Sequence, residues 1–245
     1  MITLSALPDI PEIRPGDDLA TILGQAAGKL EGGLRPDDVL AVAHKVVSKA
    51  EGRIVRLAEV FPGWEAHQLA KEHDKDPHLM QVILDESHDL VRADRGRLIC
   101  RTRHGFVCAN AGVDQSNAGR DGTVILLPLD PDASARALRH ELGCAVVITD
   151  SFGRAWRNGQ CEVAIGCAGL APADDWRGRD DSDGRELAAT VIAIADEAAA
   201  AADLARGKDS REPAVRIRGL GRHVTVEDGA GAAALVRALE DDLFR

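Results

Sequence analysis

The sequence predicts a mixed α/β fold, and three observations lead to this prediction. Short apolar runs rich in β-branched residues alternate with helical patterns along the chain. The alternation is uneven, and residues 90–110 have the pattern of paired strands with a turn at 103–105, which argues against a regular doubly wound sheet. The classical nucleotide motifs are incomplete, because residues 207–210 keep only the end of a P-loop and Gly219-Leu220-Gly221 lacks a third glycine. We therefore expect an α+β architecture that is neither a P-loop nor a Rossmann fold.

Strands are expected where apolar runs are bounded by turn residues. Residues 38–43 (DVLAVA) and 144–149 (CAVVIT) have the composition of buried strands, because almost every side chain in them is apolar. The other expected strands cover residues 2–6, 90–110 with the turn, 123–127 and 214–218.

Helices are expected where apolar residues recur three or four positions apart. Acidic residues 17 and 18 favour the start of a helix that extends to about residue 30, because acids are favourable in a first turn. Gly143 ends a helix over residues 133–142. Leu187, Val191 and Ile194 give the longest expected helix, 185–206, an apolar stripe that continues in alanines. Further helices are expected over residues 64–73, 77–86 and 232–243.

The composition excludes several classes of protein. The 245 residues form one large domain or two small lobes, and we treat residues 1–245 as a single domain. A net charge of −10 with 3 Trp, 4 Phe and no Tyr argues against nucleic-acid binding. No apolar run reaches the ~20 residues of a membrane span, and the start of the chain has no export signal, so we expect a cytoplasmic protein without a membrane partner. The 5 cysteines include no CxxC pair, which predicts buried thiols rather than a structural zinc site.

A polar segment follows directly after the expected strand 38–43. It is HKVVSKAEG, residues 44–52, and the carboxyl ends of strands are where α/β folds gather ligand groups. Lys45 and Lys49 are four residues apart, so on a helical turn they would share a face and could hold phosphates as point charges. The alternative interpretation is the solvated start of an ordinary helix.

A second polar segment is NAGVDQSN, residues 110–117. Its carboxylate, Asp114, and its carboxamides suit a hard cation or the edge of a purine. An ordinary turn rich in Asn and Asp is the alternative.

The third polar segment follows the strand 144–149. Asp150 and Ser151 offer adjacent oxygen ligands, and Arg154 and Arg157 are candidates for binding a carboxylate or phosphate of a substrate. Mg²⁺ is typically held by one or two carboxylates together with substrate phosphates, and Asp114 and Asp150 could supply that pair. Asp150 could equally be the N-cap of a helix. Together the three segments suggest a metal-assisted site for an anionic substrate.

At these residues the chain resembles the coenzyme F420-0:L-glutamate ligases, the γ-glutamyl ligases of F420 biosynthesis. The resemblance extends nearly from end to end, and several long matches in a fixed order are far more specific than one short motif. The matching segments are residues 10–18, 44–52, 110–117, 149–160, 163–170 and 176–180.

The resemblance implies a fold specific to this family, usually dimeric, and a reaction. Such enzymes use GTP and a divalent cation, Mg²⁺ or Mn²⁺, to join L-glutamate to coenzyme F420-0. The first bond is an amide to the lactyl carboxylate, later glutamates are γ-linked, and an acyl phosphate is the expected intermediate. K⁺ is a further ion that the resemblance allows. Some relatives carry a flavin-reductase-like C-terminal domain, whereas this chain is expected to be the stand-alone ligase.

The resemblance also assigns site residues. Asp114 and Asp150 would act in catalysis through the metal, with the hydroxyl of Ser151 as a further ligand where the family often has threonine. The residues that would contact GTP are Ile10, Pro11, Glu12, Ile13, His44, Lys49, Asn117 and Lys208.

One segment departs from the family pattern. Residues 207–213 (GKDSREP) are one residue shorter than expected, so the third ligand on the metal side falls near Lys208 or Asp209. Lysine cannot bind a metal while it is protonated, so either Asp209 substitutes or water completes the site. The number of metal ions and of added glutamates therefore stays open.

Two other functions remain as alternatives. One is a related metal-dependent amide ligase with a different anionic acceptor, and the other is a non-catalytic nucleotide-binding protein. In either ligase the substrates are anions, so the sequence predicts a positive cleft on an acidic body, with Lys45, Lys49, Arg154 and Arg157 beside the metal.

Overall fold

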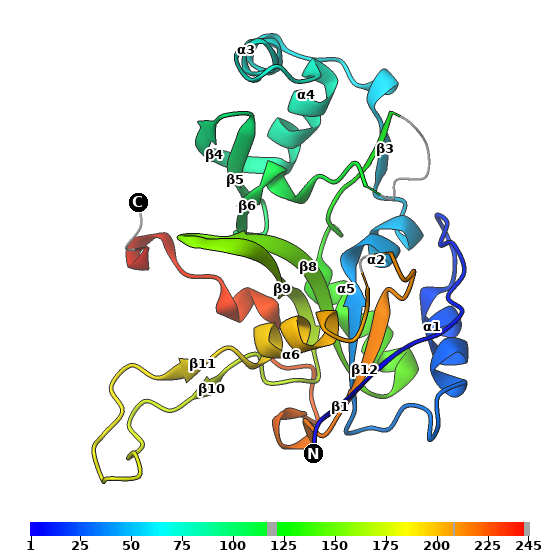
Figure 1. Ribbon diagram of the computed structural model, residues 1–245, viewed down its shortest axis with the longest axis vertical. Helices are drawn as coiled ribbons and strands as arrows, with labels where there is room; N and C mark the ends of the chain where they lie inside the picture. The colour runs from blue at the N-terminus through cyan, green and yellow to red at the C-terminus, as the bar shows by residue number, and fades with distance from the viewer. Residues whose placement is uncertain (117–121, 208, 243–245) are drawn as a thin grey trace.

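A five-stranded mixed sheet forms the centre of the main body (Figure 1). The structure is a computed structural model and describes residues 1–116, 122–207 and 209–242. The strand order is β1–β12–β2–β8–β9, with β2 parallel to β8 and the other neighbours antiparallel, so the mixed α/β prediction is confirmed. The strands are β1 (Thr3–Ala6), β12 (Ala214–Arg218), β2 (Val39–Ala43), β8 (Ala145–Arg154) and β9 (Arg157–Ala168).

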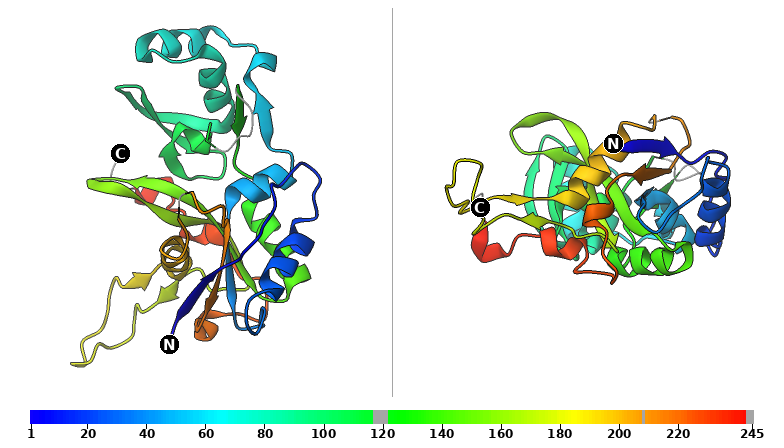
Figure 2. Two further views of the ribbon diagram at one scale, coloured as in Figure 1. Left: turned by 45° about the vertical axis from the view of Figure 1, so that its right-hand side comes forward. Right: turned by 90° about the horizontal axis from the view of Figure 1, so that it is seen from below.

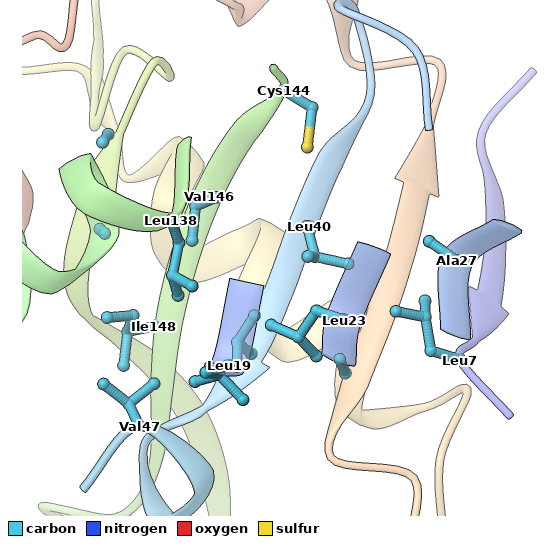
Figure 3. Packing of buried hydrophobic residues seen from close by; sticks show 14 of the residues in the cluster. Leu7, Leu19, Leu23, Ala27, Leu40, Val47, Leu138, Cys144, Val146 and Ile148 are labelled. Atoms are coloured by element: carbon cyan, nitrogen blue, oxygen red, sulfur yellow. The ribbon is translucent and has the colours of Figure 1, made fainter. Parts of the chain in front are cut away.

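The alternation of side chains across this sheet builds two separate cores. Leu40 and Val146 lie in the core between the sheet and α1, α2 and α5 (Figure 3), whereas Ala41 and Val147 lie in the core under α6. Because β2 and the first half of β8 are covered on both faces, apolar residues predominate there, which is why the sequence predicts these strands well. The helices are α1 (Leu19–Gly28), α2 (His44–Ala50), α5 (Pro131–Leu142) and α6 (Ile194–Asp203).

A smaller lobe is inserted between α2 and α5 and lies above the sheet in Figure 1. The chain enters it through β3 and leaves it through β7, which pair antiparallel. Its buried core, which includes Met80, Ile83, Leu98 and Val124, is distinct from the two cores of the main body. The predicted helices over residues 64–73 and 77–86 are confirmed at both ends. The treatment of the whole chain as one domain stays a prediction.

The elements of this smaller lobe are two helices, five short strands and two 3₁₀ turns within the described residues. They are β3 (Ile54–Arg56), α3 (Trp64–His73), α4 (Pro77–Glu86), β4 (Ser87–Asp94), β5 (Arg97–Thr102), β6 (Val107–Ala109) and β7 (Thr123–Ile125), with the turns at Leu57–Glu59 and Asn110–Gly112.

The predicted helix over residues 185–206 is wrong in its first half. The chain before α6 forms an extended arm that leaves the main body (Figure 2), with β10 (Asp174–Asp175) and β11 (Val191–Ile192) paired at its base. Farther out, the backbone N–H of Leu187 donates to the carbonyl of Arg179 at 2.8 Å. The backbone of this segment therefore pairs across the arm, and the apolar stripe becomes helical only at Ile194.

The predicted helix over residues 232–243 is also wrong as far as residue 242, because the structure has 3₁₀ turns at Ala232–Leu235 and Leu239–Asp241; residue 243 lies outside the described residues. The carboxylate of Asp132 accepts the N–H of Ala232 at 2.7 Å and that of Cys167 at 2.8 Å, which ties this segment to α5 and β9. Contacts to the main body therefore decide its conformation. A further 3₁₀ turn covers Gly221–His223. In the described part of the chain, no helix has the length and apolar character needed to cross a membrane.

Candidate active site

Two neighbouring residues at the start of α2 each contact one of the predicted carboxylates. The helix begins directly where β2 ends, so His44 and Lys45 lie at the carboxyl end of a central strand. Nε2 of His44 lies 3.3 Å from Oδ1 of Asp150, and Nζ of Lys45 lies 2.6 Å from Oδ2 of Asp114. The first turn of α2 is therefore a common neighbour of Asp114 and Asp150, which it contacts through two adjacent residues. The site lies at the junction of the main body and the smaller lobe.

The backbone and the side chain of Asp114 are both held. Its N–H and C=O form reciprocal hydrogen bonds with Ile125, at 2.9 and 2.8 Å. Its Oδ1 accepts the N–H of Ser116 at 2.6 Å, and Lys45 also donates to the hydroxyl of Ser116 at 2.7 Å. Burial raises the pKa of Asp114, but the hydrogen bonds from Lys45 and Ser116 and the charge of Lys45 outweigh it, so the pKa lies below its usual value. The carboxylate is therefore ionised at neutral pH.

Asp150 and Ser151 point to opposite faces of β8, because they are consecutive residues of a strand. Asp150 lies beside the buried ring of His44, which is only 2% exposed. Its Oδ1 also accepts the N–H of Ser151 at 2.8 Å. The interpretation of Asp150 as a helix N-cap is wrong, since the residue lies inside a strand.

The thiol of Cys108 lies close enough to Asp150 to respond to its charge. Burial and, after it, the negative charge of Asp150 raise the pKa of Cys108 to about 12. The thiol therefore stays protonated at neutral pH. All 5 cysteines are free thiols, and four of them are buried as the sequence predicts, whereas Cys161 is only partly buried.

The predicted phosphate lysine Lys49 reaches the N-terminal segment. Its side chain is 9% exposed, and its Nζ lies 2.5 Å from Oε1 of Glu12, whose side chain is 70% exposed. Ile13 is buried in the core beneath this contact, and Ile10 packs against that core. The structure thus brings together two parts of the predicted GTP site, the segment 10–13 and Lys49.

Several predicted residues lie elsewhere or outside the described residues. Asn117 and Lys208 fall outside the residues that the structure describes. Asp209 is exposed in the loop before β12. Arg154 and Arg157 face each other at the exposed end of the β8–β9 hairpin. At about 3.3 Å per residue, four residues of strand place Arg154 roughly 13 Å from Asp150.

The residues at the junction fit a hard divalent cation in their chemistry. Two carboxylates and the hydroxyl of Ser151 are oxygen ligands of the kind that Mg²⁺ and Mn²⁺ prefer. In residues 1–116, 122–207 and 209–242, no group of three or more His, Cys, Asp and Glu side chains forms a metal cluster. A cation held by Asp150 would therefore rely on Asp114 and on oxygens from water or substrate, because the hydroxyl of Ser151 faces Glu162 on the other side of β8.

A buried ion pair beside Ser151 was not predicted from the sequence. Glu162 of β9 is directly opposite Ser151 and accepts its hydroxyl at 2.5 Å, and Oε2 of Glu162 lies 3.0 Å from Nη2 of Arg206. The side chains of Glu162 and Arg206 are 5% and 7% exposed. The available signal was a charged residue directly before the apolar run 163–170, but its partner is distant in the sequence and no local pattern indicates it.

Comparison with known proteins identifies the family. The model of the F420-0:gamma-glutamyl ligase family matches residues 9–219. The chain belongs to this family. It is 44% identical over 252 residues to the coenzyme F420:L-glutamate ligase of Methanopyrus kandleri, with 100% of this chain and 98% of the relative covered. It is 43% identical over 251 residues to the protein of the same name from Methanothermobacter thermautotrophicus, with 100% and 99% covered. In this F420-0:gamma-glutamyl ligase family member, all the junction residues described above lie within the matched range.

Proposed function

We propose that this chain joins L-glutamate to coenzyme F420-0 in a reaction that consumes GTP, depends on Mg²⁺ or Mn²⁺, and releases GDP and phosphate. The observation that carries the proposal is the match, over almost the whole of both chains, to proteins named coenzyme F420:L-glutamate ligase. As a member of this family the chain is a ligase. The paired carboxylates at the junction support the finer part of the proposal.

The proposed route passes through an acyl phosphate. A carboxylate is a poor electrophile until one of its oxygens becomes a good leaving group. The lactyl carboxylate of F420-0 attacks the γ-phosphorus of GTP, and GDP leaves. The amine of L-glutamate then attacks the acyl carbon, phosphate leaves, and the amide forms with loss of a proton. Positioning and charge stabilisation suffice for such phosphoryl transfer, so no protein nucleophile is required.

The junction residues have distinct roles in this proposal. Asp114 and Asp150 would hold the divalent cation, which when bound would offset negative charge on the phosphate oxygens, whereas the hydroxyl of Ser151 lies on the other face of β8 beside Glu162. Lys49 would bind phosphate, since its ammonium group is the end of a largely buried side chain that emerges at the segment 10–13.

His44 would act on Asp150 rather than touch the nucleotide with its ring. The ring is 2% exposed, and Nδ1 lies 3.4 Å from the hydroxyl of Ser48 while Nε2 faces Asp150. Nε2 lies near Asp150 without a hydrogen bond to it, so the ring can bias the carboxylate through its charge when protonated but does not hold it. Only the backbone of His44 is left to contact GTP.

Mass spectrometry of the products tests the proposal. The chain is incubated with F420-0, GTP, L-glutamate and Mg²⁺ or Mn²⁺, and each component is omitted in turn. The expected result is an F420 species heavier by one or more glutamyl units, formed only in the complete mixture. Phosphate release that does not depend on F420-0 would instead indicate a hydrolase or a ligase with another acceptor. No phosphate release at all would indicate a nucleotide-binding protein.

The proposal includes a homodimer. The product assay also tests whether the reaction requires K⁺. Light scattering of the purified chain gives the molar mass in solution, and twice the 26.0 kDa of one chain is expected. Replacing K⁺ by Na⁺ in the product assay shows whether K⁺ is required.

A further inference from the structure

Arg216 of β12 carries a buried positive charge that forms no ion pair within the described part of the chain. The residue is only 7% exposed. Its Nη1 donates to the carbonyls of Glu31 and Gly33 at 2.9 and 2.7 Å, its Nη2 donates to the hydroxyl of Ser5 at 3.4 Å, and its Nε has no hydrogen-bond partner there. A buried charge is unfavourable unless it is paired. Burial lowers the pKa of Arg216, and the charge of Arg218 lowers it further.

Arg218 lies two residues farther along β12, on the same face of the strand. Its Nη2 donates at 3.0 Å to the carbonyl of Gly33, the same oxygen that Arg216 binds. Its Nε and Nη2 also bind the two oxygens of Asp38. Two guanidinium groups therefore meet at one carbonyl oxygen, and the buried carboxylate beside them is bound by only one of the two.

The loop between α1 and β2 adds a third arginine and an open position. A Cβ placed on Gly32 would lie 3.3 Å from Nη2 of Arg35 and 3.5 Å from Nη1 of Arg218, and no other heavy atom outside the neighbouring residues lies within 4 Å. Among the described residues, neither of these two nitrogens has a hydrogen-bond or ion-pair partner. The absence of a side chain at Gly32 thus leaves a space with a free guanidinium donor on each of two sides.

This arrangement suits a tetrahedral oxyanion. A guanidinium group presents N–H donors in a planar fork that matches the oxygens of phosphate, and a phosphate has enough oxygens to accept from two such groups at once. The carboxylates of Glu31 and Asp37 lie near these arginines, but both residues are exposed and form no ion pair with them in the described chain. Water and salt screen exposed charges, so these carboxylates do not take the place of a bound anion.

We propose that residues 31–35 form a phosphate-binding site over Gly32, in which Arg35 and Arg218 donate to the phosphate and Arg216 adds positive charge from beneath. The ligand is a phosphate group, and inorganic phosphate and a nucleotide are the two sources that share this chemistry.

The site is separate from the candidate active site. The loop lies at the opposite end of β2 from α2 (Figure 1). Six residues of extended chain lie between Asp38 and His44, which is roughly 20 Å at about 3.3 Å per residue. The inference therefore does not depend on the proposed function, and a phosphate bound here takes no part in chemistry at Asp150.

Nuclear magnetic resonance of the full chain labelled with [¹⁵N]glycine tests the proposal. Inorganic phosphate is titrated against chloride at constant ionic strength, in the wild type and in Lys49→Ala, which removes the phosphate lysine of the candidate active site. The amide signals of Gly32 and Gly33 should shift and saturate with phosphate in both proteins. No shift with phosphate, or an equal shift with chloride alone, would overturn the proposal. GDP then identifies the source, since tighter binding than phosphate at Gly32 in Lys49→Ala indicates a nucleotide, and equal or weaker binding indicates free phosphate.

Arg35→Gln tests the donor that has no structural duty. Its side chain has no hydrogen bond or ion pair in the described chain, so the variant should fold as the wild type does. Loss of one charge-assisted hydrogen bond should weaken phosphate binding at Gly32 by about 5- to 10-fold. Arg95→Gln is the matched control, because the side chain of Arg95 is 92% exposed in the smaller lobe, and it should bind phosphate as the wild type does. Wild-type affinity in Arg35→Gln would overturn the role of this arginine and the site with it.

Gly32→Asp and Gly32→Asn test the charge of the site without any ligand. Gly32 has a φ of 71°, a conformation that Asp and Asn tolerate better than most residues, and the two side chains have nearly the same shape. The carboxylate of Gly32→Asp would lie between Arg35 and Arg218, so this variant should melt at a higher temperature than Gly32→Asn at low salt, and the difference should shrink at high salt. Gly32→Asp should also lose phosphate binding, because its own carboxylate occupies the place of the anion. A melting temperature of Gly32→Asn equal to or above that of Gly32→Asp would overturn the proposal.

Discussion

Replacement of Asp38 by Asn should destabilise the fold strongly, although Asp38 lies away from the candidate site. Asp38 is 0% exposed and binds Arg218 through both oxygens, with Nε and Nη2 each at 2.8 Å. Its Oδ2 also accepts the N–H of Arg35 at 2.9 Å. The contact joins β12 to the segment that leads into β2, so it fixes the order of strands at the centre of the sheet.

The size of the destabilisation by Asp38→Asn depends on how exposed Arg218, the partner of Asp38, is. Breaking a buried ion pair by removing one partner generally destabilises a protein by about 3–5 kcal/mol. The side chain of Arg218 is 21% exposed and keeps a hydrogen bond to the carbonyl of Gly33 at 3.0 Å, so we expect the lower end. For a chain of this size, about 3 kcal/mol lowers the melting temperature by roughly 6–12 °C.

Thermal unfolding followed by calorimetry at neutral pH measures this loss, with Asp37→Asn as the matched control. Asp37 is the exposed neighbour, so its replacement should change the melting temperature far less. Equal melting temperatures for Asp38→Asn and Asp37→Asn would refute the reasoning.

The same variants should show a pH dependence of defined sign. Burial raises the pKa of Asp38, but the hydrogen bonds from Arg218 and Arg35 and the charge of Arg218 outweigh it, so the folded-state pKa is below the usual value. Such a group stabilises the fold above its unfolded pKa, about 3.9, and loses that contribution as the pH falls through the folded pKa. The difference between wild type and Asp38→Asn should therefore shrink in acid.

Three further changes test the site and the packing. Asp150→Asn should lose most ligase activity while it keeps the wild-type melting temperature, and wild-type turnover in the product assay would count against a metal role for Asp150. Lys49→Ala should weaken GTP binding, measured by calorimetry, without unfolding the protein. Glu12→Gln should tighten GTP binding by a factor of up to about 5, because the exposed carboxylate no longer competes with phosphate for Lys49. An unchanged affinity for GTP in both variants would contradict the assignment of Lys49. Gly166→Ala should destabilise by at least about 1–3 kcal/mol, since its Cβ would lie 2.3 Å from the carbonyl oxygen of Pro131. Gly153→Ala is its control, because no atom lies within 4 Å of the corresponding position, and equal stability of the two would be inconsistent with this packing.

The sequence predicts well those helices and strands that are determined by residues close together in the chain. The apolar strands β2 and β8 and the helices α3 and α4 are examples. The end of α5 is another, since Gly143 adopts the left-handed conformation, with a φ of 70°, that closes a helix. Each of these is decided by residues within a few positions of one another.

Elements decided by distant partners are those that the sequence did not reveal. The segment before α6 has a helical apolar pattern, but hydrogen bonds across the arm, such as that between Leu187 and Arg179, outweigh it. The segment after residue 231 has helix-forming alanines, but its first N–H groups bind Asp132 of α5. Helix propensity amounts to less than about 1 kcal/mol per residue, which a few tertiary hydrogen bonds readily exceed.

The same distinction applies to the candidate site. Asp114, Asp150 and the lysines could be selected because each follows a strand in a polar segment. That adjacent residues of α2 contact both carboxylates could not be predicted, because it depends on how the smaller lobe meets β8. Glu162 and Arg206 were missed for the same reason, since each is an unremarkable charge until the fold pairs them.

The net charge of −10 led us to expect a positive cleft on an acidic body. The ion pairs at the junction show how the local charge is arranged. Both lysines at the junction face carboxylates, Lys45 with Asp114 and Lys49 with Glu12, so local positive charge is largely matched. The two pairs differ in exposure, because the side chain of Asp114 is 34% exposed and that of Glu12 is 70% exposed. An ion pair with a well-exposed partner contributes only about 0–1 kcal/mol, so phosphate oxygens can replace Glu12 at little cost. Lys49 is thus the lysine whose charge is available to an anionic substrate, whereas Lys45 is held by Asp114 and Ser116 and serves to fix the carboxylate.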